Sequence, residues 1–305
     1  DHVSVSPLVA RGVAGEVLEM EADLAFDKAG NDRAQLAGPE IGVLRGRGLL
    51  RWEKANLARF NPFLTSGKLE GHSSGLIELE RTGKRHMKIA GRMGGMISVM
   101  KGPVKLKITR ADTNFVWDNS GLKTRCDILL QDGGRLEGQF SSLEPAGLHW
   151  PTSGEMRSSW QDIDVSFIRT WLPAALEMKG KLSGRVAGRL LDGARFELSG
   201  ETTMAGGVIA WQGGEGVIQA AAERVGAEFA WSKSVLQGSM DVRFPAHGSV
   251  QSTFRVPAAA RFPLRIDKGG ATRITARGDI REKGIVSAFF PGLVEESKGR
   301  FSFEV

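Results

Sequence analysis

The stretch Leu236-Gln237-Gly238-Ser239-Met240-Asp241-Val242-Arg243-Phe244 decides the fold class, because apolar or small residues alternate with polar ones along its whole length. Successive side chains of a β-strand point to opposite faces of a sheet, so this period of two predicts a strand with one apolar and one polar face. Four further stretches alternate in the same way: residues 18–26, 104–108, 182–190 and 250–256. We therefore expect an all-β protein with an antiparallel sheet.

Turn and helix signals agree with this expectation. Asp132-Gly133-Gly134 and Asp192-Gly193 stand between alternating runs and tolerate the positive φ that hairpin turns require. Helical patterning is confined to Leu57–Leu64, Phe167–Met178 and Ile285–Val294, and each of these stretches contains a proline. Because proline interrupts a long helix, we expect a few short helices that cap the sheet.

An internal repeat organises the chain. The series Phe115, Val116, Trp117, Leu122, Asp127, Gly134, Phe140 recurs, with Ala in place of Val, as Phe229, Ala230, Trp231, Leu236, Asp241, Gly248, Phe254, always 114 residues later. A second series, Gly67-Lys68-Leu69-Glu70-Gly71, returns as Gly180-Lys181-Leu182-Ser183-Gly184 and begins again at Gly299-Arg300-Phe301. We expect one elongated domain with a partial repeat at 1–56, full repeats at 57–164 and 165–284, and the start of another at 285–305. The alternation that continues to Val305 leads us to expect a longer parent chain.

Composition narrows the classes of function. The 41 Lys and Arg and 35 Asp and Glu give a net charge of +6, and the two signs are interleaved rather than gathered into the basic patch of a nucleic-acid-binding protein. The single cysteine, Cys126, excludes an internal disulfide and a multi-cysteine zinc site. No apolar run approaches the roughly 18 residues that a membrane-spanning helix needs.

No pattern predicts catalysis. Gly71-His72-Ser73-Ser74-Gly75 matches the G-x-S-x-G nucleophile elbow, which requires a sharp turn from a strand into a helix. Here the serine lies inside an alternating run, and no helical pattern follows. The five histidines are scattered singly, without metal-ligand spacing. We expect no enzyme activity, no catalytic residue, no metal site and no cofactor.

The order of these features resembles the TamB family of the AsmA-like superfamily. The features are a proline-bearing cap, the Gly-Lys-Leu-x-Gly strand, the aromatic-x-Trp motif, an Asp-containing strand and a strand that ends near Val256-Pro257. The resemblance covers most of Leu49 to Val305 and is strongest from Val165 onward, where 285–293 is similar to the recurring cap of the family.

The resemblance implies a repeating β-groove, in which a twisted antiparallel sheet curls into a half-pipe with an apolar interior. It also implies a periplasmic protein of a Gram-negative bacterium, anchored in the inner membrane, that carries phospholipid toward the outer membrane or assists the assembly of outer-membrane proteins. An outer-membrane barrel protein of the BamA or TamA type would be its partner, through regions outside this segment.

The predicted groove-lining residues share an apolar character and an inward position in the alternation. They are Leu69, Ile77, Leu122, Cys126, Ile128, Leu130, Leu182, Val186, Leu190, Phe196, Leu198, Leu236, Met240, Val242, Phe244, Phe254 and Val256. Two alternatives stay open. A closed sandwich would hide the same apolar face. A periplasmic scaffold or chaperone for outer-membrane protein (autotransporter) assembly could bind unfolded strands at its sheet edges by β-augmentation, together with the barrel partner.

Overall fold

The fold is given by a computed structural model, which describes residues 2–12, 15–27, 43–63, 68–82, 86–101, 104–147, 149–165, 176–213, 216–245, 248–261, 265–266, 270–283 and 298–304. The predicted all-β class is confirmed: among the described residues the strands pair antiparallel, the sheet is not closed, and there is almost no helix. No helix in the described ranges has the length and apolar character needed to cross a membrane. The chain divides into unit 1 (residues 1–131 and 137–154) and unit 2 (residues 132–136 and 155–305).

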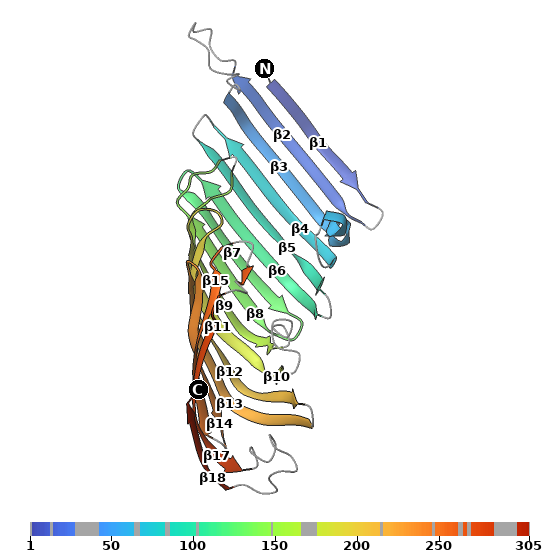
Figure 1. Ribbon diagram of the computed structural model, residues 1–305. Coiled ribbons are helices and arrows are strands. Elements are labelled where there is room, and N and C mark those ends of the chain that lie inside the picture. Colours follow the sequence, from blue (N-terminus) through green and yellow to red (C-terminus); the bar gives the residue numbers. More distant parts are fainter. Residues whose placement is uncertain are drawn as a thin grey trace. The chain divides into compact units, whose positions relative to one another are not determined.

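Unit 1 is an antiparallel sheet in which each strand pairs with the next one along the chain, from β1 through β7 (Figure 1). Its strands are β1 (His2–Arg11), β2 (Val17–Asp27), β3 (Val43–Asn56), β4 (Lys68–Arg81), β5 (Met87–Lys101), β6 (Val104–Asp118), β7 (Gly121–Leu130) and most of β8 (Arg135–Ser142). Several strands have 14 or 15 residues, which is long for a globular protein, so each presents many side chains to either face.

The strands of unit 2 also pair antiparallel, mostly with the next strand along the chain. Its strands are β9 (Gly154–Asp164), β10 (Leu176–Lys179), β11 (Lys181–Leu190), β12 (Phe196–Gly213), β13 (Gly216–Ser232), β14 (Val235–Phe244), β15 (Gly248–Ala259), β16 (Arg265–Ile266), β17 (Arg273–Lys283) and β18 (Lys298–Glu304). β11 pairs with β9 and β12, and β12, β13, β14, β15, β17 and β18 then pair in succession.

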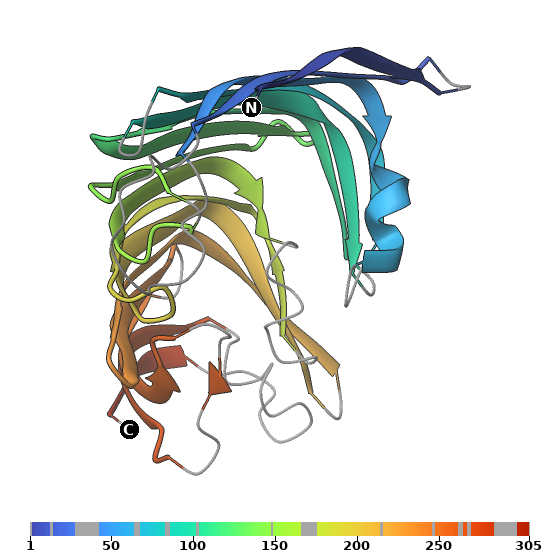
Figure 2. The same cartoon turned by 90° about the horizontal axis from the view of Figure 1, so that it is seen from above.

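The predicted helices have different outcomes. The first is confirmed as the 3₁₀ helix η1 (Leu57–Phe63), which contains Pro62 and packs beside β4 (Figure 2). The prediction for Phe167–Met178 is wrong at its end, because residues 176–178 belong to β10 and pair with β12. The rest of that stretch, 167–175, and the third predicted helix, 285–294, lie outside the described residues.

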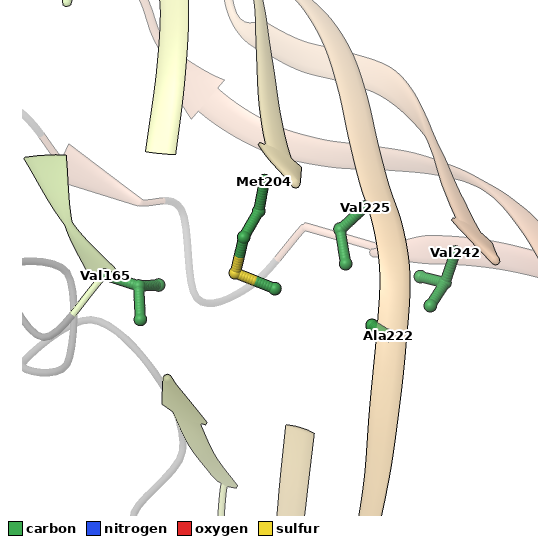
Figure 3. Close-up of a cluster of buried hydrophobic side chains, with 5 residues drawn as sticks. All are labelled: Val165, Met204, Ala222, Val225 and Val242. Carbon is green, nitrogen blue, oxygen red and sulfur yellow. The ribbon is translucent and has the colours of Figure 1, made fainter. Parts of the chain in front are cut away.

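Unit 2 contains a compact apolar cluster of Val165, Met204, Ala222, Val225 and Val242 (Figure 3). Met204 is completely buried, and Val165, just after β9, packs against side chains that belong to β12, β13 and β14. Leu182 and Phe244 adjoin the cluster. Residues that are far apart in the sequence therefore cover part of the sheet face to which the groove prediction assigned Val242.

Candidate functional site

The strand register in unit 2 places the predicted apolar residues on one face of the sheet. Val186 lies opposite Gly200, Gly200 opposite Phe229, Phe229 opposite Gly238, and Gly238 opposite Phe254. Directly opposed residues in an antiparallel sheet project to the same side. We call this side the apolar face of unit 2.

The remaining predicted residues of unit 2 fall on the same face. A second row, parallel to the first, joins Leu198, Trp231, Leu236 and Val256. The other members, found by alternation along the same strands, are Leu182, Leu190, Phe196, Met240, Val242 and Phe244.

Unit 1 has an apolar face of its own, built by the same logic. Ile77 lies opposite Gly91, Gly91 opposite Phe115, and Phe115 opposite Thr124. The other predicted residues of unit 1 share this side: Leu69, Leu122, Cys126, Ile128 and Leu130. The structure thus gathers the predicted residues onto one face in each unit, while their role in binding stays a prediction.

These faces are only partly covered. On the apolar face of unit 2, Val242 is 6% exposed, whereas Met240 on the same strand is 40% exposed. On the apolar face of unit 1, Met93 and Leu18 are 42% and 45% exposed. Large apolar side chains left half in water at aligned positions form a surface that an apolar chain can cover.

Charge is segregated to the opposite side. Along β11 to β15, the apolar-face positions of 182–190, 196–204, 225–231, 236–244 and 250–256 carry no charged residue. The polar face of unit 2 instead bears ion pairs such as Arg185 Nε to Glu201 Oε1 at 2.8 Å. In unit 1, Arg47 and Glu80 are paired on the polar face at 3.5 Å. These exposed pairs contribute little to stability but keep that face in water.

Sequence reasoning missed a tryptophan-over-glycine arrangement that occurs in both units. A Cβ placed on Gly75 would come within 2.3 Å of the Trp52 ring, and one on Gly184 within 2.6 Å of the Trp160 ring. Only glycine leaves the indole room to lie against the neighbouring strand.

A strand irregularity accompanies each of these tryptophans. Lys54 and Asp162 both have positive φ, at 52° and 54°, and each stands two residues after the tryptophan. Their backbone N–H groups donate to serine hydroxyls on the next strand, Ser74 Oγ at 3.0 Å and Ser183 Oγ at 3.1 Å. The sequence signal is a Trp-x-Lys or Trp-x-Asp on one strand and a Ser-Gly on the neighbouring strand. It is too short to detect without knowing which strands pair.

A second tryptophan pair marks the ends of the apolar faces. Trp117 Nε1 donates to the Glu144 carbonyl at 3.1 Å, and Trp231 Nε1 donates to the Ala258 carbonyl at 2.9 Å, in both cases 27 residues further along the chain. The two copies of the predicted repeat therefore form the same hydrogen bond. In unit 1 the segment that follows β8 lies against the Trp117 indole, and in unit 2 the end of β15 lies against the Trp231 indole.

In unit 1 this segment is residues 143–153, of which all but 148 are described, and we call it the strap. Trp150 stacks on Trp117 with ring centroids 5.7 Å apart and planes 6° from parallel. The Glu144 carboxylate accepts hydrogen bonds from the hydroxyls and backbone N–H groups of Thr152 and Ser153. These donors, led by the Ser153 hydroxyl, lower the pKa of Glu144 from 4.5 to about 2.

The G-x-S-x-G match lacks the turn from a strand into a helix that a nucleophile elbow requires, because residues 71–75 lie within β4. Ser73 lies inside β4, and its hydroxyl accepts the Trp52 indole N–H at 3.1 Å. No group of three His, Cys, Asp or Glu side chains in the described ranges is placed to hold a metal ion. The Cys126 thiol sits on the apolar face of unit 1 and accepts from the Thr113 hydroxyl at 3.5 Å.

Two hollows lie mainly on the polar faces. One of about 480 Å³ in unit 2 is lined by Glu201, Glu228, Asp241 and Arg224 among others, and one of about 960 Å³ in unit 1 includes Arg51 and Arg92 in its lining. The charges of their lining residues are mixed in sign. The apolar faces are therefore the stronger candidate for function.

No family model, curated protein or solved structure matches this chain.

Proposed function

We propose that the apolar faces hold the acyl chains of phospholipid, and that the protein serves intermembrane phospholipid transport in support of outer-membrane biogenesis. The observation that carries the proposal is the alignment of apolar and small side chains across β11 to β15 and across β3 to β7, in which Met240 and Met93 are 40% and 42% exposed. An acyl chain needs apolar contact without directional bonds, and these rows offer that contact.

The energetics favour such a ligand. Each methylene transferred from water to an apolar surface gains about 0.8 kcal/mol, so a diacyl lipid that crosses water unaided meets a barrier on the order of 20 kcal/mol. A row of partly exposed Met, Ile and Phe side chains lowers this barrier over its whole length. The same rows lack the convergent polar groups that a site for a small polar metabolite would need.

The resemblance to the TamB family supports the same proposal and extends it. In a TamB-like protein the sheet would curl into a half-pipe with the apolar faces inside. The protein would lie in the periplasm and be anchored to the inner membrane. The barrel partner would meet regions outside this segment.

The test compares matched substitutions on the two faces. Met93 and Met96 lie on the same strand and are both exposed, but Met93 is on the apolar face and Met96 on the polar face. In unit 2, Val186 is on the apolar face and its neighbour Ala187 on the polar face. We expect the double variant Met93→Asp/Val186→Asp to lose co-purifying phospholipid, measured by native mass spectrometry with lipid extraction.

The control variant is Met96→Asp/Ala187→Asp, which adds the same charge to the polar face. It should keep the lipid, and circular dichroism should show both variants folded. A wild-type protein that is folded but free of lipid, or equal loss of lipid in both variants, contradicts the proposal.

A further inference from the structure

We propose that Arg81 binds the negatively charged head of an acyl ligand, a phosphate or a carboxylate, and so makes unit 1 select anionic amphiphiles. The inference rests on the proposed function, because the acyl chain of such a ligand would lie on the apolar face of unit 1. It adds the chemistry of the head and the residue that recognises it.

Arg81 occupies an exceptional position in the strand register. Of the residues that the register places on the apolar face from β3 to β7, it is the only charged one with a described side chain. It lies opposite Gly46 on β3 and opposite Met87 on β5, and it is half-buried. A charge beside apolar surface costs free energy unless polar or oppositely charged groups meet it.

Neither the fold nor the neighbouring residue accounts for a charge at this position. The matching apolar-face positions of β11 to β15 in unit 2 carry no charged residue. Glu80, the residue before Arg81, points to the opposite side of the sheet, where it pairs with Arg47 at 3.5 Å. The charge therefore distinguishes the face of unit 1 from that of unit 2.

The face beside Arg81 is long enough for an acyl chain. Met93 lies opposite Gly75, six residues before Arg81 on β4, so about 20 Å of strand separates Arg81 from Met93. The hydrocarbon core of a bilayer is about 30 Å thick and holds two layers of acyl chains, so one chain spans about 15 Å. The apolar-face positions between Arg81 and Met93 are uncharged: Leu79, Ile77, Ile89 and Gly91.

The chemistry of the arginine side chain suits an oxyanion head. A guanidinium keeps its charge at every physiological pH and binds a phosphate or a carboxylate through two parallel N–H donors. Arg81 already interacts with other groups of the chain, but its five N–H donors let it bind an anion and keep those partners. The turn that follows is closed by the Thr82 N–H, which donates to the His86 carbonyl at 3.0 Å and fixes the end of the hairpin.

The test compares three ligands that share one acyl chain: lysophosphatidic acid, the free fatty acid and the uncharged monoacylglycerol. Each is titrated below its critical micelle concentration and followed by native mass spectrometry. The parent chain carries Val186→Asp, so that only the face of unit 1 binds. We expect it to bind the two anionic ligands about tenfold more tightly than the monoacylglycerol.

Two variants of this parent assign the preference to a residue. Arg81→Gln should bind all three ligands with the affinity that the parent has for monoacylglycerol, which also shows that the variant is folded. Arg47→Gln, on the polar face of the adjacent strand, should keep the tenfold preference. Equal binding of the three ligands by the parent, or a preference that survives in Arg81→Gln, overturns the inference and leaves the acyl site standing.

Two further outcomes separate the possible sources of the anion. An excess of inorganic phosphate should leave lysophosphatidic acid bound, because free phosphate lacks the apolar contact. Displacement by inorganic phosphate would make Arg81 a site for the free anion and would also overturn the inference. If none of the three ligands binds the wild-type chain, the proposed function itself is contradicted, and the role of Arg81 falls with it.

Discussion

Units 1 and 2 carry the same kind of apolar face but cover it to different extents. In unit 2, Val165 closes over Met204, Val225 and Val242, and these side chains are buried. In unit 1, the buried apolar side chains on the face are Trp117, Leu122 and Leu130 among the described residues, while Met93 and Leu18 are more than 40% exposed.

The difference shows that one sequence pattern can serve two purposes. A covered row of apolar side chains contributes to the stability of its unit, because its surface is withdrawn from water on folding. A row left half exposed contributes less to stability and keeps surface free for a ligand. We therefore expect the covered part of the unit 2 face, around Met204, to respond to substitutions as a core does, and the exposed part of the unit 1 face, around Met93 and Leu18, to respond as a surface does.

The largest expected effect compares two methionines. Met204→Ala, at a completely buried site, should cost about 2–5 kcal/mol of unfolding free energy, because it leaves a cavity. Met93→Ala, at a 42% exposed site, should cost less than about 1 kcal/mol. Urea denaturation followed by circular dichroism measures both, and similar losses in the two variants would break the distinction between the units.

A smaller loss of stability, equal in the two units, is expected at the tryptophan-over-glycine arrangement that both units contain. Gly75→Ala and Gly184→Ala each bring a Cβ against a tryptophan ring and a backbone carbonyl, so each should cost about 1–3 kcal/mol. Gly226→Ala is the control, because no atom lies within 4 Å of its added Cβ, and it should be nearly neutral. An effect at only one of the first two sites would show that the Trp52 and Trp160 arrangements are not equivalent. The measurement is thermal unfolding of the three variants.

The smallest effect concerns the strap, which unit 1 has and the described part of unit 2 replaces with a buried alanine segment. The pKa of Glu144 is lowered in the folded protein, so its contribution is present above about pH 4.5 and is lost as the pH falls toward 2. We expect Trp150 fluorescence to change in that window, taken as the difference between wild type and Trp150→Phe. Glu144→Gln should abolish this step, and a step that persists in the variant would assign it to another group.

The predicted groove-lining residues could be assigned to one face because side-chain direction in a strand depends only on local alternation, while their role in lining a groove stays a prediction. Leu236 to Phe244 needed no knowledge of their partners to be assigned to one side. The end of the second predicted helix failed because residues 176–178 gain strand pairing with β12, a contact with residues more than 30 positions away. The strap was missed for a similar reason, because its position depends on the stacking of Trp150 on Trp117, a contact between residues 33 positions apart that no sequence pattern predicts.

The sequence by itself determined the all-β class, the division of each strand into an apolar and a polar side, and the recurrence of Trp117 and Trp231, because these depend on the period of two and on repeated residues. Only the tertiary structure decided which apolar residues are buried and which remain exposed. Val242 and Met240 are indistinguishable in the alternation, yet one is covered by the cluster around Met204 and the other is not. Burial depends on which distant segments fold over a face, and alternation contains no information about them.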